Sequence, residues 1–307
     1  MLGAGKEGRR ALFFYGEERV YAFCDNNKEL WGTKILGKPV WSYAMLKEYL
    51  MKENFDIVLS VSRVDAVRNI IDKLRKDDVA YRYFSDEEQS SVASNEECFT
   101  NIYKNHRWGS EVGQDFYSGS GSHTKTIIYP YIDTLTRLIV NNELHHIVEI
   151  GCGDFFVMGK VLENLRVKDF DYEYRGMDVV ADLVVRNQKM FGCHNVNFSC
   201  VDASSSESEL PAGDICIIRQ VLQHLSNADI LCILDKVKKY RYLLVTEHIY
   251  EGEGIQYNLD KGTGANIRLN KCSGVYLEQP PYDRKNIVHL LRIPEYGGII
   301  RTSLIIQ

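Results

Sequence analysis

The sequence has no long apolar run, no block of basic residues and no closely paired cysteines, and each absence argues against a class of protein. No uninterrupted apolar stretch reaches the ~18 residues that a membrane-spanning helix needs. The formal net charge is −5 and the lysines and arginines are dispersed, so binding to a phosphate backbone has little support. The first residues lack a basic segment followed by an apolar core, which argues against a secretion signal. We therefore expect neither a membrane nor a nucleic-acid partner.

The eight cysteines show no C-x-x-C spacing and do not cluster with histidines. They are Cys24, Cys98, Cys152, Cys193, Cys200, Cys216, Cys232 and Cys272. Scattered cysteines within strand-like runs are typical of reduced thiols in a cytoplasmic protein. We expect neither a disulfide framework nor a metal site.

What the chain does contain is ordinary globular composition, with 45% hydrophobic and 26% charged residues in 307. This length favours two domains over one. The alternation of strand-like and helix-like segments predicts a small domain at 1–84, a polar connector at 85–110 and a larger domain at 111–307. Both domains are expected to be α/β and Rossmann-like.

The first domain opens on glycines with G-x-G-x-x-G spacing, Gly3, Gly5 and Gly8, which continue into a helix. A strand should precede such a turn, and almost nothing does, so either the first strand is a stub or the start is truncated. A strand that ends at Asp25 follows about 20 residues after the first glycine, where a ribose-binding acid is expected.

Three stretches of this domain resemble the small Rossmann-like domains at the front of bacterial sugar-modifying enzymes, including PglD-type sugar acetyltransferases. They are Gly-Ala-Gly-x-x-Gly at 3–8, Ala-Phe-x-Asp-Asn at 22–26 and Lys-x-Leu-Gly-Lys-Pro-Val at 34–40. The resemblance implies a nucleotide-sugar site or a packing module. Binding of NAD is the minority alternative.

The second domain is organised around residues 147–154, Ile-Val-Glu-Ile-Gly-Cys-Gly-Asp. A buried strand, a glycine turn and a helix bring backbone N–H groups up to a ligand. Glu149 would repel phosphate at this turn, so it favours a cationic or hydroxyl-rich ligand. Further strands are expected at 172–177, 196–201, 214–218 and 242–246. Two extended runs at 287–293 and 298–306 predict an antiparallel hairpin that closes a seven-stranded, mostly parallel sheet.

Acidic residues recur where consecutive strands end: Glu149 and Asp154, then Asp178, then Asp202. Ligands of open α/β sheets bind outside these carboxyl ends. A single such acid is usually a helix cap, but the set favours a binding site. Asp178 follows Gly151 by 27 residues and suits two ribose hydroxyls, and Asp202 with Ala203 suits an adenine amino group.

These segments resemble class I S-adenosylmethionine-dependent methyltransferases over residues 110 to 307. The resemblance rests on Val-Glu-Ile-Gly-Cys-Gly-Asp, Gly-Met-Asp-Val at 176–179, Val-Asp-Ala at 201–203 and Gly-Asp-Ile-Cys at 213–216. It implies S-adenosylmethionine as cofactor. The residues that it places at the cofactor are Gly119, Glu149, Gly151, Gly153, Asp178, Val179, Asp202, Ala203, Arg219 and Gln220.

Two features resemble methyltransferases encoded with bacterial polysaccharide and capsule-modification enzymes. They are the run Arg-Gln-Val-Leu-Gln-His-Leu-Ser-Asn at 219–227 and the Gly-Ser-Gly-Ser loop within 117–123. The loop reads equally well as a flexible linker or as a lid over a bound cofactor. Within such an enzyme, the candidate bases for an acceptor hydroxyl are His224, the pair His248 and Glu247, and His123. The alternative for His224 is a structural hydrogen bond to backbone at the start of the following helix.

The insertion at 250–286 is rich in aromatic and hydrogen-bonding residues, among them Arg268 and Tyr276, which we expect to contact the substrate. The sequence thus predicts methyl transfer to an oxygen of a sugar, nucleotide-sugar or other glycan-modification intermediate. The acceptor would be a small molecule or glycan, and a homo-oligomer remains open. The alternative is a non-catalytic nucleotide- or cofactor-binding scaffold for polysaccharide-biosynthesis enzymes. An NAD-dependent oxidoreductase is the third reading.

Overall fold

The computed structural model describes residues 1–53, 55–61, 64–84, 94–111, 113 and 115–307. The chain divides into two compact units, Met1–Ser91 and Val92–Gln307. Among the described residues, no helix combines the length and the apolar character needed to cross a membrane.

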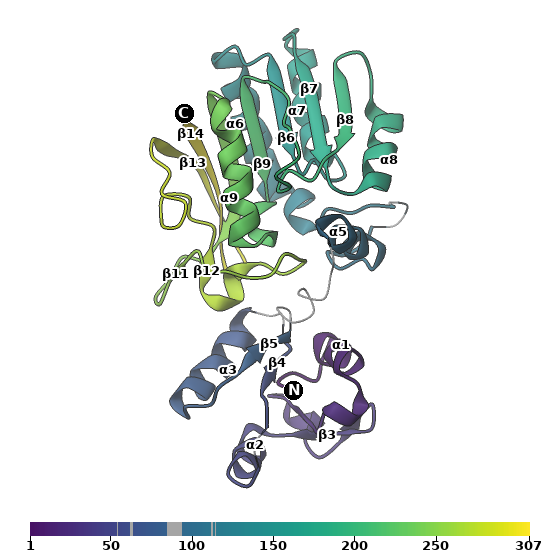
Figure 1. Ribbon diagram of the computed structural model, residues 1–307, viewed down its shortest axis with the longest axis vertical. Coiled ribbons are helices and arrows are strands. Elements are labelled where there is room, and N and C mark those ends of the chain that lie inside the picture. The colour runs from purple at the N-terminus through teal and green to yellow at the C-terminus, as the bar shows by residue number, and fades with distance from the viewer. Residues whose placement is uncertain (54, 62–63, 85–93, 112, 114) are drawn as a thin grey trace. The chain divides into compact units, whose positions relative to one another are not determined.

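The second unit is built on one seven-stranded sheet (Figure 1). Its strands are β6 (His146–Ile150), β7 (Glu173–Asp178), β8 (Val196–Cys200), β9 (Ile215–Arg219), β10 (Tyr242–Ile249), β13 (Ile287–Glu295) and β14 (Gly298–Ile306). Their order is β13-β14-β10-β9-β6-β7-β8, and only β14 runs antiparallel to its neighbours. The predicted mostly parallel sheet with a terminal hairpin is confirmed.

Both faces of this sheet are covered, because successive apolar residues of a strand point to opposite sides. Ile147 packs in the cluster that α6 (Lys125–Asn141), α7 (Phe156–Val167) and α8 (Ala181–Phe191) share with the sheet. Val148, the next residue, joins the opposite cluster with α9 (Asn227–Lys236). The unit is therefore a three-layer α/β sandwich.

The direction of strand addition reverses between β6 and β9. From β6 the chain adds β7 and β8 on one side, and then crosses back to add β9 and β10 on the other. Such a switch point opens a crevice at the carboxyl ends of the two central strands, which is where open α/β sheets bind ligands. Residues that follow β6 and β9 are therefore expected to line a binding site.

The insertion at 250–286 is packed onto the second face of the sheet. It contains β11 (Gln256–Tyr257), η6 (Arg268–Lys271) and β12 (Ser273–Gly274), and Val275, Leu277 and Tyr282 join the core beside α9.

The predicted connector lies partly outside the described residues, at 85–93. Its remainder forms α5 (Asn95–Lys104), which packs on the second unit. The Asn95 amide donates to Ser204 Oγ at 2.8 Å, and the Trp108 indole N–H donates to the carbonyl of Ala265 at 3.2 Å.

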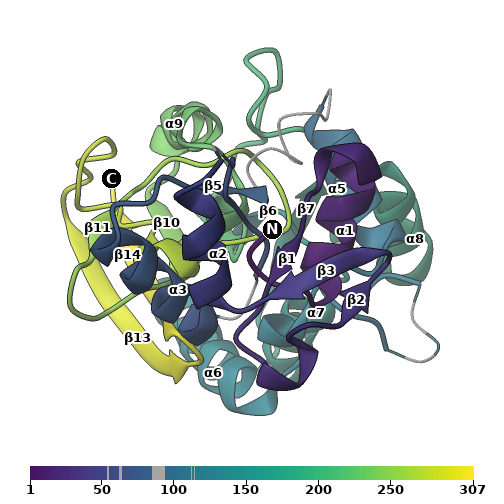
Figure 2. The same cartoon turned by 90° about the horizontal axis from the view of Figure 1, so that it is seen from below.

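In its described residues, the first unit contains helices and short strands, most of which pair in parallel. Its elements are α1 (Lys6–Tyr15), β1 (Phe23–Cys24), β2 (Lys34–Ile35), β3 (Lys38–Trp41), α2 (Tyr43–Leu50), β4 (Val58–Leu59), α3 (Val64–Lys76) and β5 (Arg82–Tyr83). Figure 2 shows β2, β3 and β1 side by side. Leu2 makes parallel bridges to both Cys24 and Leu59, so one residue occupies the position expected for the first strand.

Candidate functional site

The turn after β6 has a backbone that few side chains tolerate. Gly151, Gly153 and Phe155 all have positive φ, at 72°, 54° and 65°. A Cβ on Gly151 would lie 2.3 Å from Cγ2 of Val221, which follows β9. The close approach of the two central strand ends therefore requires glycine here. The N–H groups of Gly151 and Cys152 donate to the carbonyl of Met177, which ties the turn to β7.

Asp178, the last residue of β7, holds the turn from the other side. Its Oδ2 accepts the N–H of Gly153 at 3.0 Å, and its Oδ1 accepts the N–H of Val180 at 3.1 Å. Burial raises the pKa of Asp178, although these backbone donors act in the opposite direction. A carboxylate has about four acceptor positions, so both oxygens retain capacity for hydroxyl donors of a ligand.

Glu149 lies beneath the turn, fully buried, and accepts a hydrogen bond from the hydroxyl of Tyr174. The pKa of Glu149 is raised to about 7, mainly by burial and to a smaller extent by the nearby Asp178 and Asp154. The hydrogen bond from Tyr174 and the charge of Arg219 oppose this shift. Three buried carboxyl groups thus lie around the turn, and the guanidinium of Arg219 is close to those of Glu149 and Asp154.

Arg219 ends β9 on the far side of the switch point. Its Nη2 donates to the carbonyl of Gly121 at 2.6 Å, and its Nη1 donates to Ser122 Oγ at 3.1 Å. The guanidinium carbon lies 5.0 Å from the ring centroid of Tyr131, within cation–π range. The role of Arg219 in this structure is to hold the glycine-serine loop.

That loop, which includes η3 (Ser120–Ser122), packs on the turn. Gly119 has a φ of 88°, and a Cβ on Gly121 would lie 2.2 Å from Oε1 of Gln220. Glycine permits the positive φ at position 119 and the close approach of the Gln220 side chain at position 121. A flexible linker requires neither, so the geometry favours the lid interpretation over the linker.

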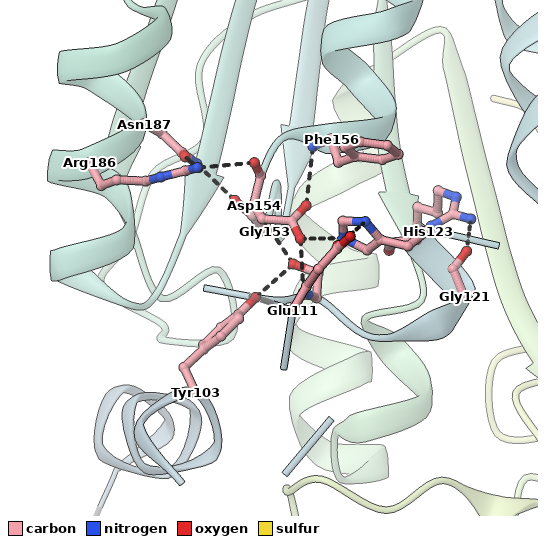
Figure 3. Close-up of polar contacts among 12 residues, drawn as sticks. Tyr103, Glu111, Gly121, His123, Gly153, Asp154, Phe156, Arg186 and Asn187 are labelled. Atoms are coloured by element: carbon pink, nitrogen blue, oxygen red, sulfur yellow. Dashed lines mark hydrogen bonds and ion pairs between the residues drawn. The ribbon is translucent and has the colours of Figure 1, made fainter. Parts of the chain in front are cut away.

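Asp154 receives most of the polar contacts at the turn (Figure 3). Its Oδ2 accepts from His123 Nε2 at 2.7 Å and from the N–H of Ser118 at 2.9 Å, while Oδ1 accepts the N–H of Phe156 at 3.1 Å. Burial alone would raise the pKa of Asp154, but these donors hold it below its usual value. Asp154 is therefore an ionised anchor.

Two residues of α8 support the turn from behind, and the sequence did not indicate them. The side-chain amide of Asn187, fully buried, donates to the carbonyl of Gly153 at 2.7 Å, and Arg186 donates to the carbonyl of Asp154 at 3.2 Å (Figure 3). Their helix follows the strand that carries Asp178, so a search of the first helical turns after each strand-end acid would have found them.

The predicted adenine-side residues lie at the end of the neighbouring strand β8. Asp202 Oδ1 accepts the backbone N–H and the hydroxyl of Ser204, at 2.9 and 2.6 Å. Ala203 is buried and its carbonyl accepts from Lys236, while the carbonyl of Val179 accepts from the thiol of Cys200. Their bonds shape the loop after β8 and leave the predicted role in cofactor binding a prediction.

His224 is placed differently from the expectation for a catalytic base. It lies in η4 (Leu222–His224), where its Nδ1 is 3.2 Å from the carbonyl of Gly264 and its Nε2 is 3.3 Å from the amide nitrogen of Gln223. The ring packs against Trp108 with centroids 4.9 Å apart. The pKa of His224 is lowered to about 3, mainly by burial and also by the charge of Lys261. With both nitrogens engaged, the ring has a structural role and the predicted one does not fit.

Arg268 was expected to contact the substrate, and its burial contradicts that role, because only 1% of it is exposed. Its guanidinium donates to the carbonyls of Leu222, Gln223, Leu225 and Leu259 and to Oδ1 of Asn227. Most of those carbonyls belong to η4 and the residues next to it, which lie outside the regular helices and strands. Tyr276 is likewise buried, and its hydroxyl donates to the carbonyl of Tyr250. Both residues anchor the insertion.

His248 keeps a nitrogen available. Its backbone N–H donates to Gln223 Oε1 at 2.8 Å, but its Nε2 is buried and has no hydrogen-bond partner among the described residues. Burial lowers the pKa of His248 to about 4, so the ring is neutral at neutral pH and a weaker proton acceptor than an exposed imidazole. The adjacent Glu247 accepts the N–H groups at 221–223 and so fixes the chain after β9.

Within the part of the chain that the structure describes, no three His, Cys, Asp or Glu side chains gather as a metal site would require.

Comparison with known proteins gives matches in structure alone. No protein-family model and no curated protein sequence matches the chain. Human N-acetylserotonin methyltransferase, solved with S-adenosylmethionine, is 12% identical with a TM-score of 0.46, over 70% of this chain and 60% of that one. The N-methyltransferase NodS from Bradyrhizobium japonicum, solved with S-adenosylhomocysteine, is 14% identical with a TM-score of 0.43, over 67% and 98%. The citrinin polyketide synthase CMeT domain is 12% identical with a TM-score of 0.45, over 85% and 86%. At such identities, what the chain binds has to be argued from its own residues.

Proposed function

We propose that the second unit is an S-adenosylmethionine-dependent methyltransferase that binds its methyl donor at the turn after β6. The observation that carries this proposal is the charge of the turn. Glu149, Asp154 and Asp178 are buried around it, and Arg219 lies close to Glu149 and Asp154. Buried charges require compensation. A ligand with a sulfonium and an ammonium group would supply it, and a phosphate would not.

The residues present suit the parts of this donor. Asp178 keeps acceptor capacity for two ribose hydroxyls, Glu149 suits the ammonium end, and Asp202 with Ala203 lies at the neighbouring strand end, where the adenine is expected. Gly151 and Gly153 present backbone without side chains. When bound, the donor supplies a methyl group that is already activated by the positive sulfur.

The protein then has to align an acceptor atom with that methyl group, exclude water and remove a proton. We propose His248 as the base, because its Nε2 is buried and has no hydrogen-bond partner in the described residues. We propose an oxygen of a sugar, nucleotide-sugar or related glycan intermediate as the acceptor. This choice is supported by the resemblance of the 219–227 run to polysaccharide-modifying methyltransferases.

Calorimetry of the full chain with S-adenosylmethionine and S-adenosylhomocysteine tests the donor. We expect micromolar binding of both, and no binding of NAD. Absence of donor binding would sink the methyltransferase proposal, and binding of NAD alone would favour an oxidoreductase.

A radiolabelled donor offered with panels of sugars, nucleotide-sugars and lipid-free glycan fragments tests the acceptor. On an active acceptor, His248→Ala should lower kcat by about 10²–10⁴-fold and leave the Kd of the donor unchanged. Donor binding with no transfer to any member of the panel would support the non-catalytic scaffold instead.

A further inference from the structure

We infer that His123 is a positioning residue that fastens the 117–123 loop across the switch point, and that the fastened loop retains the methyl donor. This inference rests on the proposed function and adds to it the part of the chain that controls how long the donor stays bound. His123 is thereby assigned a role other than that of a base.

The loop is attached at both sides of the crevice. On one side Arg219, at the end of β9, holds Gly121 and Ser122. On the other side Asp154, in the turn after β6, holds Ser118 and His123. Because β6 and β9 flank the switch point, a loop attached to both ends spans the place where the ligand is expected.

The attachment at Asp154 is a two-way clasp. The N–H of Ser118 donates to the Asp154 carboxylate at 2.9 Å, and the N–H of Asp154 donates back to Ser118 Oγ at 2.9 Å. Tyr103 of α5 adds a contact to the same Oγ at 3.0 Å. A Cβ on Gly153 would lie 2.5 Å from Ser118 Oγ, so the clasp brings the loop directly against the glycine turn.

His123 completes the clasp through a ring that is held on both faces. It stacks on Tyr117 and on Phe156, with centroids 4.5 and 4.4 Å apart. Its Nε2 points to Asp154, and its Nδ1 lies 3.8 Å from Oε2 of Glu111 (Figure 3). This ring joins the loop, through Tyr117, to the first residue of α7. Removing it would leave Asp154 buried with fewer donors, which weakens the attachment on this side.

The test compares His123→Ala with His123→Gln and with the parent. Glutamine places an amide nitrogen near the position of Nε2 and can still donate to Asp154. We expect His123→Ala to raise the Kd of S-adenosylmethionine about ten-fold, mainly through faster dissociation, and His123→Gln to recover much of this loss. Stopped-flow fluorescence measures dissociation, since Trp108 Cβ lies near Gly119.

His146→Ala is the matched control. His146 also pairs with an aspartate, with Nδ1 3.2 Å from Asp214 Oδ2, but it begins β6 at the amino end, away from the turn. This variant should bind the donor like the parent. Thermal unfolding of each variant shows whether any loss of affinity comes from a loss of folding.

Hydrogen exchange of the ligand-free protein separates this inference from the proposed function. His123→Ala should speed exchange of the Ser118 and Phe156 amides, whose N–H groups bond to Asp154. If the parent binds no donor, the proposed function fails and donor retention fails with it. If the parent binds but His123→Ala leaves both the dissociation rate and this exchange unchanged, the clasp is wrong and the methyltransferase proposal stands.

Discussion

Each unit of this protein carries a strand position, a glycine turn and a helix, and in both an aspartate accepts a backbone N–H of the turn. In the second unit Asp178 Oδ2 accepts the N–H of Gly153 at 3.0 Å. In the first, Asp25 Oδ2 accepts the N–H of Ala4 at 2.8 Å. An acid after the second strand thus stabilises the turn after the first in both. This shared contact says nothing about function by itself.

The residues around the two turns differ in charge. Two positions before the first glycine, the second unit has Glu149 and the first has Met1; directly after the second glycine, they have Asp154 and Lys6. The second turn is covered by the 117–123 loop, whereas the position of a Cβ on Gly5 has no atom within 4 Å. Glycine spacing therefore builds the turn, and the neighbouring charges decide which ligand it suits.

The largest expected effect separates the two acids. Asp178→Ala should weaken binding of S-adenosylmethionine at least about 100-fold, because it removes the acceptors for the ribose hydroxyls and leaves the N–H of Gly153 without its partner. Asp25→Ala should leave the donor affinity unchanged. Calorimetry on both variants measures this contrast, and equal losses would show that the donor does not belong to the second turn.

The next effect concerns the third glycine of the first turn, Gly8. A Cβ there would lie 2.0 Å from the carbonyl oxygen of Gly3, so α1 would have to move away from its strand. We expect Gly8→Ala to destabilise the first unit by about 3 kcal/mol, with no change in donor affinity. Denaturant unfolding with hydrogen exchange in each unit gives both quantities. Tolerance of alanine at this position would contradict the close packing of α1.

The pH dependence of stability sharpens the comparison at Glu149. Its folded-state pKa of about 7 lies above its ordinary value of 4.5, so the folded state binds more protons between these values. The stability that it contributes is complete below pH 4.5 and is lost as pH rises to about 7. Glu149→Gln removes this loss, and the variant should gain about 3 kcal/mol on the parent across that range.

His224 and His248 titrate in the opposite sense, since their folded-state pKa values of about 3 and 4 lie below 6.5. Both histidines therefore reduce the free energy of unfolding as pH falls below 6.5, in the parent and in Glu149→Gln alike. The difference between the two unfolding curves therefore isolates Glu149. A difference that stays constant from pH 4 to pH 8 would show that folding does not shift the pKa of Glu149.

The parts of this structure that the sequence predicted are those that follow from periodicity along the chain. Apolar runs bounded by glycine and acidic residues located the strands of the second unit, and the terminal hairpin followed from two extended runs around Gly297 and Gly298. Because parallel strands end at one edge, the acids after them could be placed near one another before any coordinates.

What periodicity could not predict is which side chain meets which across long separations. His123 and Ser118 are 31 and 36 residues from Asp154, and only the packed loop brings them together. Arg268 was misplaced for a related reason. A charged residue in a polar insertion suggests exposure, but carbonyl groups around η4 needed a donor with several N–H groups, and Arg268 supplies them.

The smallest expected effect is at Gly5, the counterpart of Gly153. Gly5 has a φ of −74° and free space where a Cβ would be, so Gly5→Ala should cost only about 0.5 kcal/mol, as expected for a less suitable helix cap. Gly153 has a φ of 54° and lies against Ser118, so Gly153→Ala should both destabilise the turn and weaken the donor. Thermal unfolding and calorimetry on Gly5→Ala and Gly153→Ala compare a turn that has space for a Cβ with a turn that the 117–123 loop covers. If both alanine variants match the parent in stability and donor affinity, the close contact between Gly153 and Ser118 does not restrict the residue at the second turn. The hydrogen bonds at Asp154 would then break more easily than their lengths indicate.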